Sequence, residues 1–408
     1  MIRYKKRSVK IEGFIISSSS ARFAASTTSG HGIEGQAEDA VYKSNSRPLL
    51  KDLYIKEQPS IGMYLGGIME HGLLDTIVVQ NCVKHGFVID DGSYAGRINK
   101  DDKPFEFTLD RCRATECGGN ALLLGHGTEV QYPRLFILNQ FEALSCAWDV
   151  SQRQSEYQII DRCTQAIYNQ VDIEDHFYNQ TTTRLGNPRT ALSSPAKGVD
   201  VVRDQSIFEQ PYFSSLSECI NVSSSSDGVR VEYPTVFAGT YTTKQTNAFV
   251  ISPSAKDVTI RALANHFSNG ADNLCQMQST SSRYYIDGVM YKGQPQTTFD
   301  YKMALTPDGL GINSGTLTST TNLVSVTGQG DTTDSLNKIR FTSSVDGSLG
   351  EKMTLIFGGA SSYIITINDV SLPTSGNIRT KDGSAILMSD TTRSVVSFIY
   401  NGTHWVEV

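Results

Sequence analysis

The chain has 408 residues, of which 39% are hydrophobic and 34 are glycine, and its formal net charge is −6. This composition indicates a folded protein with many turns, and the acidic balance disfavours a nucleic-acid partner, because nucleic-acid binding needs a basic surface. No apolar run approaches the roughly 18 residues of a membrane helix, and residues 11–16 are too short and too polar to form a secretory signal core. We therefore expect synthesis in a cytosol and no membrane partner.

The seven cysteines are an odd number and include no Cys-x-x-Cys pair. This pattern fits neither a zinc site nor a disulfide framework. A free cysteine is by default a small buried hydrophobic side chain. We therefore expect the cysteines to lie in the core, and the sequence predicts no metal and no cofactor.

Short strands rich in β-branched and aromatic residues recur over residues 8–285, separated by Gly, Ser, Asn and Asp. One pattern returns every 22 to 30 residues: an apolar residue, a polar residue, any residue, and then Cys or a larger apolar side chain. Its fourth positions are Leu53, Cys82, Cys112, Phe141 and Cys163. Because Cys, Phe and Leu are all accepted there, we expect one equivalent core position per repeat. Repeats of this length, with short strands and variable loops, predict an all-β, right-handed parallel β-helix.

Each repeat continues with a small residue followed by an apolar alternation, in which the middle side chain points outward. The predicted outward column consists of Glu34, Tyr64, Val88, Leu123, Asp149, Tyr168, Asp200, Asn221 and Arg230.

The repeat spacing stops around residues 285–315. From about Leu317, short alternating strands are separated by turns such as Asp346-Gly347, Asp382-Gly383 and Asn401-Gly402. Short antiparallel strands with frequent turns predict a β-sandwich, and Asn-Gly between two strands is a hairpin signal. The expected organisation is a β-helix over residues 1–290, a linker over 291–316 and a C-terminal β-sandwich over 317–408.

The segment GEKMTLIFGGASSYIITINDV and the ending SVVSFIYNGTHWVEV resemble a C-terminal module of bacteriophage tailspike proteins, and the repeats over residues 8–285 are similar to the β-helix of such spikes. The resemblance implies a homotrimer in the phage tail of the virion, made in the host cytoplasm, that degrades bacterial capsular polysaccharide or O-antigen during host recognition. The usual N-terminal attachment domain has no counterpart in the sequence. We therefore expect attachment to the tail or baseplate through a part that this chain lacks.

The resemblance implies cleavage by hydrolysis or by β-elimination, and paired outward carboxylates favour an endo-acting glycoside hydrolase, for which we expect no cofactor. Such enzymes use two carboxyl groups, about 5–5.5 Å apart for retention and about 6.5–9.5 Å apart for inversion of configuration. In the predicted column Asp149 and Asp200 flank Tyr168, so strand spacings of about 4.7–4.9 Å would place them about 9–10 Å apart. Tyr168 would then stack on a sugar ring.

Further polar residues lie on or just beyond the predicted strands. As additional catalytic candidates the sequence offers Asp90, Asp91, Glu156 and Glu174. As substrate-binding candidates, besides Tyr168, it offers Tyr64, Arg153, Asp172 and His176. Two alternatives stay open: a polysaccharide lyase, in which Arg153 and Tyr168 would matter most, and a fibre that binds glycan without cleaving it.

Overall fold

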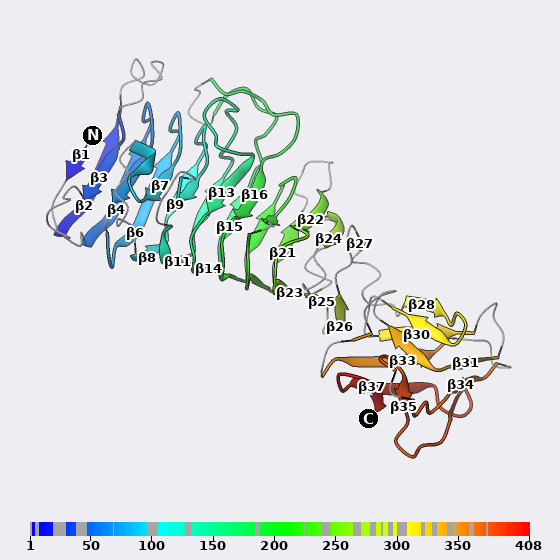
Figure 1. Cartoon of the computed structure of the whole chain (residues 1–408). Helices are drawn as coiled ribbons and strands as arrows, with labels where there is room; N and C mark the ends of the chain where they lie inside the picture. The colour runs from blue at the N-terminus through cyan, green and yellow to red at the C-terminus, as the bar shows by residue number, and fades with distance from the viewer. Residues whose placement is uncertain are drawn as a thin grey trace. The chain divides into compact units, whose positions relative to one another are not determined.

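The computed structural model describes residues 2–4, 8–18, 30–37, 47–67, 69–95, 105–126, 132–183, 188–223, 225–237, 245–263, 271–277, 283–286, 289–292, 297–299, 308–319, 323–328, 333–340, 346–347, 350–358, 363–372 and 374–408. The chain divides into two compact units, Met1–Ser279 and Thr280–Val408 (Figure 1). Within the described residues the secondary structure is almost all β, and the helical element is the short 3₁₀ turn η1 (Ser93–Ala95). None of these residues belongs to a helix that is long and apolar enough to cross a membrane. The all-β prediction is confirmed.

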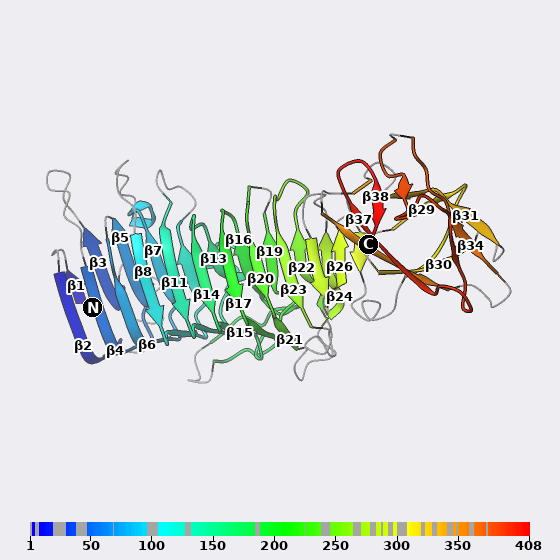
Figure 2. The same ribbon diagram turned by 90° about the horizontal axis from the view of Figure 1, so that it is seen from below.

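In the first unit, sheet A pairs its strands in parallel throughout. Its strands within this unit are, in order, β1 (Ile2–Tyr4), β3 (Ile33–Ala37), β5 (Met63–Gly67), β7 (Phe87–Asp90), β10 (Leu122–Leu124), β13 (Tyr157–Asp161), β16 (Lys197–Val201), β19 (Ile220–Val222), β22 (Gln245–Ile251) and β24 (Ala271–Met277). Between two neighbours in this order the chain passes through sheet B and then returns, so the strands of each sheet follow one another side by side (Figure 2).

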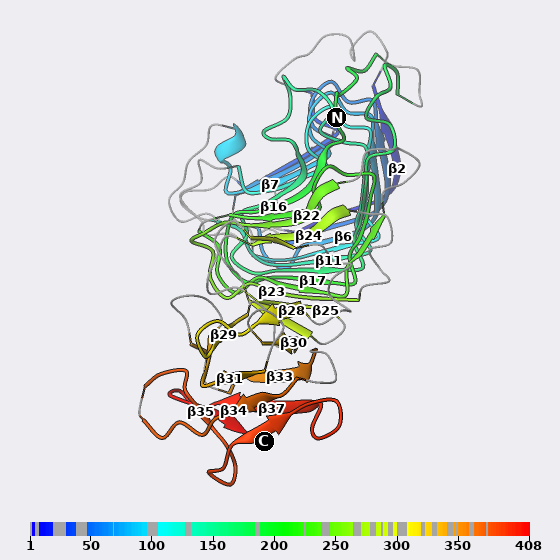
Figure 3. The same ribbon diagram turned by 90° about the vertical axis from the view of Figure 1, so that its right-hand side faces the viewer.

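Sheet B begins with long strands and then divides into two branches. The long strands are β2 (Ser8–Ser17), β4 (Arg47–Lys56) and β6 (Leu73–Gln80). Branch B1 continues from the first half of β6 and contains β8 (Phe105–Asp110), β11 (Arg134–Asn139), β14 (Ala166–Asn169), β17 (Ser206–Glu209), β20 (Arg230–Glu232) and β23 (Thr259–Ala262). Branch B2 continues from the second half and contains β9 (Arg113–Thr115), β12 (Glu142–Leu144), β15 (Asp172–Glu174), β18 (Tyr212–Ser214) and β21 (Thr235–Phe237). Figure 3 shows β7, β16 and β22 of sheet A apart from β11 and β17 of branch B1.

A single residue with positive φ bends sheet B where the branches separate. Gly13 (φ 76°), Asp52 (51°) and Thr76 (55°) occupy this position in the long strands, and Arg111 (51°) and Gln140 (51°) occupy it between the branches. Each side chain other than glycine costs roughly 1–2 kcal/mol in this left-handed region. The buried residues on both sides of the bend offset that cost.

The inward faces of the strands form the core, and aromatic side chains of neighbouring strands stack there. Phe107 and Phe136 stack with centroids 5.3 Å apart, and Tyr168 and Phe208 stack at 4.4 Å. Full burial of one such side chain contributes roughly 1.5–3 kcal/mol. Tyr168 has no exposed surface, so the prediction that it points outward is wrong.

The six cysteines whose side chains the structure describes are free and buried, which confirms that they are core residues. Their predicted equivalence is wrong. Cys112 follows the corner between the branches at the position of Phe141, whereas Cys82 follows β6 and aligns with Cys117 and Cys146. Cys163 follows β13 of sheet A. The local pattern is the same because a polar residue at a bend followed by an inward side chain occurs at several corners of each repeat.

The second unit contains parallel and antiparallel pairs, not the purely antiparallel strands that were predicted. Its strands are β25 (Arg283–Ile286), β26 (Val289–Lys292), β27 (Thr297–Phe299), β28 (Asp308–Gly311), β29 (Thr316–Thr318), β30 (Leu323–Thr327), β31 (Asp334–Leu336), β32 (Lys338–Arg340), β33 (Lys352–Phe357), β34 (Ile365–Ile367), β35 (Ile378–Arg379), β36 (Ile386–Met388), β37 (Val395–Tyr400) and β38 (Trp405–Glu407). β28 pairs with β30, and β29 pairs with β32. Strands of this unit therefore begin within residues 291–316, where a linker was expected.

The ending of the chain forms the predicted hairpin. β37 and β38 pair antiparallel, the Asn401 N–H donates to the carbonyl of His404 at 2.9 Å, and Gly402 has φ 97°. Trp405 is fully buried in the core of this unit, and its Nε1 donates to the carbonyl of Asp346 at 2.9 Å. The apolar alternation read from the sequence therefore builds the core of this unit.

Candidate functional site

The outward column of sheet A differs from the predicted one at its centre. The register pairs Glu34, Tyr64, Val88, Leu123, Ile160, Asp200 and Asn221 in succession. Ile160 occupies the place predicted for Asp149 and Tyr168. Tyr168 and Arg230 belong to strands of branch B1. The sequence pattern does not separate them from sheet A, because the motif of a small residue followed by an apolar alternation recurs in both sheets.

Asp149 and Asp200 are therefore not neighbours in one column, and the predicted pair is not assembled. Asp149 lies in the turn after β12, where it accepts hydrogen bonds from the backbone N–H of Ser151 at 2.9 Å and from its hydroxyl at 2.7 Å. Asp200 lies on β16 and accepts a hydrogen bond from Asn221 at 2.8 Å. Burial raises the pKa of Asp200.

Asp90 and Asp91 lie at the turn that leads into η1, and Tyr64 contacts this turn from β5. Asp90 accepts hydrogen bonds from the Tyr64 hydroxyl at 3.1 Å, from Gly92 N–H at 2.9 Å and from Tyr94 N–H at 2.7 Å. Asp91 accepts one from Ser93 N–H at 3.0 Å. Both carboxyl groups are buried. Their contacts serve to hold this turn in place.

Glu156 and Arg153 lie in a network of satisfied charges before β13. Glu156 is 3.8 Å from Arg153 and 3.4 Å from Lys197, and Lys197 is also 3.6 Å from Glu218. Glu218 accepts a hydrogen bond from the Tyr157 hydroxyl at 2.7 Å. Each carboxylate here has a cation or a donor, as is typical of a structural network.

Branch B2 brings the remaining candidates together, along with residues that were not singled out. Arg113, Glu142, Asp172 and Tyr212 pair in succession on β9, β12, β15 and β18. Glu174 lies two residues after Asp172 and therefore on the same face of β15. We call Glu142, Asp172 and Glu174 the acidic ladder.

Asp172 of the acidic ladder has a strongly raised pKa. Burial, the carboxylates of Glu174 and Glu142 and a side-chain hydrogen bond with Glu174 together raise its pKa from 3.8 to about 7, and Arg113 opposes the increase. Arg113 itself forms an ion pair with Glu142. The Oδ1 atom of Asp172 is buried and has no hydrogen-bond partner among the described residues. Asp172 is therefore an acid that holds its proton up to neutral pH, in the range that general acid catalysis requires.

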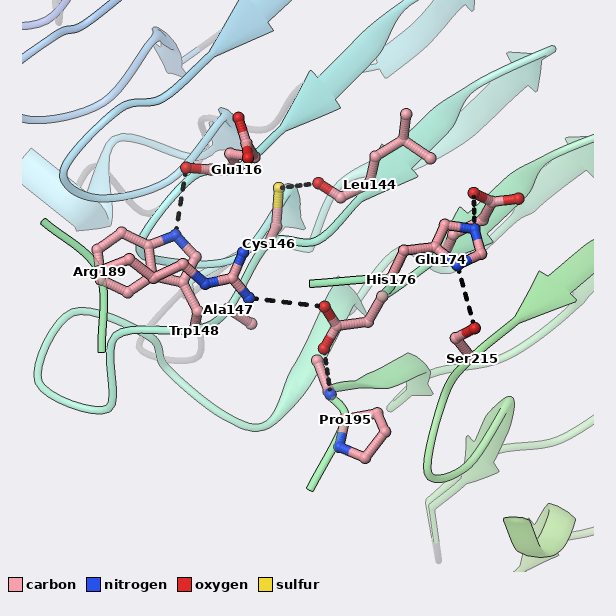
Figure 4. A network of polar contacts seen from close by, with 12 residues as sticks. Glu116, Leu144, Cys146, Ala147, Trp148, Glu174, His176, Arg189, Pro195 and Ser215 are labelled. Atoms are coloured by element: carbon pink, nitrogen blue, oxygen red, sulfur yellow. Dashed lines mark hydrogen bonds and ion pairs between the residues drawn. The ribbon is translucent and has the colours of Figure 1, made fainter. Parts of the chain in front are cut away.

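His176 fixes the neighbouring carboxylate (Figure 4). Its Nε2 lies 2.6 Å from Oε2 of Glu174, and its Nδ1 lies 3.1 Å from the hydroxyl of Ser215, which follows β18. One ring thus connects the acidic ladder to the turn of the next repeat. Glu174 has a cationic or hydrogen-bonding partner in His176, whereas Asp172 is partly buried beside the carboxylates of Glu174 and Glu142.

The segment that returns from β15 to sheet A is fastened beside the ladder by buried contacts (Figure 4). Asp175 accepts a hydrogen bond from Ala196 N–H at 2.7 Å and lies 3.7 Å from the guanidinium of Arg189. Arg189 lies 5.8 Å from the ring of Trp148, whose Nε1 donates to the carbonyl of Glu116 at 3.2 Å. Burial raises the pKa of Asp175 to about 6. This buried layer supports the backbone that carries Glu174 and His176.

Sequence reasoning missed Glu142, Tyr212, Ser215 and Arg113. The signal that could have found three of them is the corner residue: Arg113, Glu142 and Tyr212 each come two residues after a positive-φ residue, Arg111, Gln140 and Gln210 respectively. Aligning the repeats on that corner would have placed these side chains in one column with Asp172.

No protein-family model matches the chain, and no curated protein is similar to it in sequence. Among the described residues no group of three or more His, Cys, Asp and Glu side chains has an arrangement that could hold a metal ion.

Proposed function

We propose that this protein is a phage tailspike depolymerase that hydrolyses a bacterial surface polysaccharide at the acidic ladder. We further propose that its first unit is a right-handed parallel β-helix, to which the alternation of the chain between parallel sheets lends support. The observation that carries the function is the contrast between two carboxyl groups of one strand. Asp172 has a pKa raised to about 7, while Glu174 is held by His176. Pairs of this kind divide the work of acid and base in glycosidases.

In the proposed mechanism, Asp172 donates its proton to the glycosidic oxygen as the bond to the sugar breaks. A water molecule forms the new bond to the anomeric carbon and gives its proton to Glu174, the ionised partner, whose carboxylate His176 keeps in place. Tyr212, in register with Asp172 on the next strand, offers an aromatic face for a sugar ring. The outer face of a sheet suits a long chain substrate, because such a substrate can lie across several strands.

The alternative lyase is less well supported, because its two residues do not meet. Tyr168 is stacked in the core, and Arg153 donates to the carbonyl of Ala147 at 3.1 Å. A fibre that binds glycan without cleavage would use the same acidic face, and the raised pKa of Asp172 would then have no role in it.

A homotrimer is part of the proposal, and an apolar column on branch B1 supports association with further copies. Leu73, Thr108, Ile137, Ile167 and Ile207 pair in succession and point outward. They line a groove of about 640 Å³, and Ile137 remains 39% exposed. A continuous apolar stripe on a surface marks an interaction site. Incorporation into the virion, with a partner at the tail or baseplate, completes the proposal.

The direct test is incubation of the purified protein with a panel of bacterial capsules and O-antigens. We expect a fall in polymer mass for a matching polysaccharide, with one new reducing end per cut. New ends that absorb in the ultraviolet as unsaturated uronates would identify a lyase instead. Binding without any fall in mass would identify a non-catalytic fibre.

A further inference from the structure

A cleft of about 340 Å³ lies over the outer face of sheet A, on a different part of the unit from the acidic ladder. Segments before β7, at η1, after β10 and before β13 form it. Its lining residues are Lys84, His85, Tyr94, His126, Ser151, Gln152 and Gln154. The functional assignment above uses none of them.

Tyr94 is the centre of this cleft, and its position is fixed from several sides. Its ring lies 5.7 Å from His85 at 84° and 4.9 Å from His126 at 71°, so both imidazoles meet it edge-on. Beneath it, Tyr94 packs against the outward apolar cluster of sheet A, which includes Tyr64 and Leu123. The backbone N–H of Tyr94 donates to Asp90 at 2.7 Å. The cleft is therefore formed before any ligand arrives.

Both imidazoles of the cleft are uncharged at neutral pH. Burial, with smaller contributions from Lys84 and His126, lowers the pKa of His85 to about 3. Burial also lowers the pKa of His126; Arg162 acts in the same direction, and Asp91 opposes. The Nδ1 of His85 accepts a hydrogen bond from Asn120 N–H at 2.9 Å, so its proton resides on Nε2.

The chemistry of this lining matches a sugar. Gln152 and Gln154 offer amides, which can donate to and accept from sugar hydroxyls, and the oxygen of Ser151, whose proton is donated to Asp149, can accept. Tyr94 offers an aromatic surface, and Lys84 is the one formally charged group among the lining residues. Small-ligand sites combine aromatic walls with a few placed polar groups in this way. A single cation in an otherwise neutral lining favours a ligand unit that carries a carboxylate.

We propose that this cleft is a second carbohydrate-binding site, which holds an acidic sugar unit of a polysaccharide through a contact between its carboxylate and Lys84. This second site rests on the proposed function only in taking carbohydrate as the ligand, and binding there needs no cleavage at the acidic ladder.

The test uses the full chain carrying Asp172→Asn, which limits cleavage during the measurement. Its probes are oligosaccharides from uronate-containing bacterial capsules, presented on an array and titrated in solution, together with the same oligosaccharides after reduction of their carboxyl groups. Gln152→Trp, on the turn before β13, fills the cleft. Lys84→Gln removes the cation, and Lys256→Gln is the matched control at an exposed lysine of a distant repeat.

We expect Gln152→Trp to weaken binding of the acidic oligosaccharides at least tenfold. Lys84→Gln should weaken binding of the acidic forms but not of the reduced forms, and Lys256→Gln should change neither. Binding that is unaffected by both cleft substitutions would overturn the inference, as would the absence of binding to every acidic oligosaccharide of the panel. Cleavage of polymer by the unsubstituted protein is measured separately. Its absence would contradict the proposed hydrolase and leave the cleft result intact.

Discussion

The imidazole of His176 joins Glu174 to Ser215: Nε2 lies 2.6 Å from the carboxylate and Nδ1 lies 3.1 Å from the hydroxyl. Asp172, two residues earlier on the same face of β15, is partly buried and has the carboxylates of Glu174 and Glu142 beside it, and its pKa rises to about 7. Two carboxyl groups of one short strand thus have opposite surroundings. That difference assigns the proposed acid to Asp172 and the proposed ionised partner to Glu174.

Loss of the imidazole should weaken catalysis through Glu174. For His176→Ala we expect cleavage to fall about 10- to 100-fold, the range typical of a supporting group that orients a functional one. Ser215→Ala should have a smaller effect, because the contact between His176 and Glu174 remains. The readout is cleavage rate as a function of pH. A change in the shape of the pH profile supports a positioning role, whereas an unchanged rate for His176→Ala contradicts it.

Tyr168 in the core and Tyr212 beside the acidic ladder should respond differently to truncation. Tyr168→Ala removes a stacked core side chain, and we expect it to lower the free energy of unfolding by about 3–5 kcal/mol. Tyr212→Ala should leave the fold stable and raise the substrate concentration needed for half-maximal cleavage. Thermal unfolding and substrate titration measure the two effects. A destabilised Tyr212→Ala variant and a fully stable Tyr168→Ala variant would contradict the observed register.

Asp161 should make stability depend on pH. It is buried on the inward side of sheet A and accepts a hydrogen bond from Ser206 at 2.7 Å, and burial raises its pKa from 3.8 to about 6. Because the pKa is raised on folding, its contribution to stability is full below about pH 4 and is lost as the pH rises through about 6.

In the Asp161→Asn variant the side chain at this position cannot ionise. The free energy of unfolding of this variant, relative to that of the unsubstituted protein, should therefore rise between pH 4 and pH 8 by on the order of 3 kcal/mol. Chemical denaturation at several pH values measures this difference. A difference that stays constant across the range would show that Asp161 does not ionise differently in the folded chain.

The apolar column of branch B1 should hold copies of the chain together. Ile137→Asp places a charge in the column, and we expect it to lower the oligomeric state in solution, measured by light scattering after size exclusion. Val150→Asp is the control, since Val150 is 63% exposed and lies in a turn before β13. An Ile137→Asp variant with unchanged mass would remove the apolar column from the proposed interface.

Much of the fold could be predicted from the sequence, because hydrophobic alternation and turn residues are local. The strands around Met353, Phe398 and Trp405 follow directly from that alternation. The parallel repeats are visible in the same way, as side chains such as Cys112 and Phe141 return at one corner. What local patterns could not supply is the number of corners in each repeat. Cys82 and Cys112 both follow one apolar and two polar residues but lie at different corners.

The candidate site depended on that missing register. Glu174, Asp172 and His176 could be selected from the sequence because they are polar residues at a strand, and the structure places them together. Asp149 could be selected for the same reason and lies in a turn. Nothing local distinguishes the two cases. Only the alignment of Asp172 with Glu142 and Tyr212 on neighbouring strands does so, and that alignment depends on the lengths of the segments between strands.

The account depends most directly on Asp172 acting as the proton donor. The decisive measurement is the rate of polysaccharide cleavage from pH 4 to pH 9 for the unsubstituted protein, for Asp172→Asn, and for Glu209→Gln as a control at an exposed carboxylate of β17. We expect the unsubstituted rate to fall as the pH rises through about 7, where Asp172 loses its proton. Asp172→Asn should lower the rate by about 10²- to 10⁴-fold, and Glu209→Gln should not change it. Full activity of Asp172→Asn, with the same pH profile as the unsubstituted protein, would contradict the central claim.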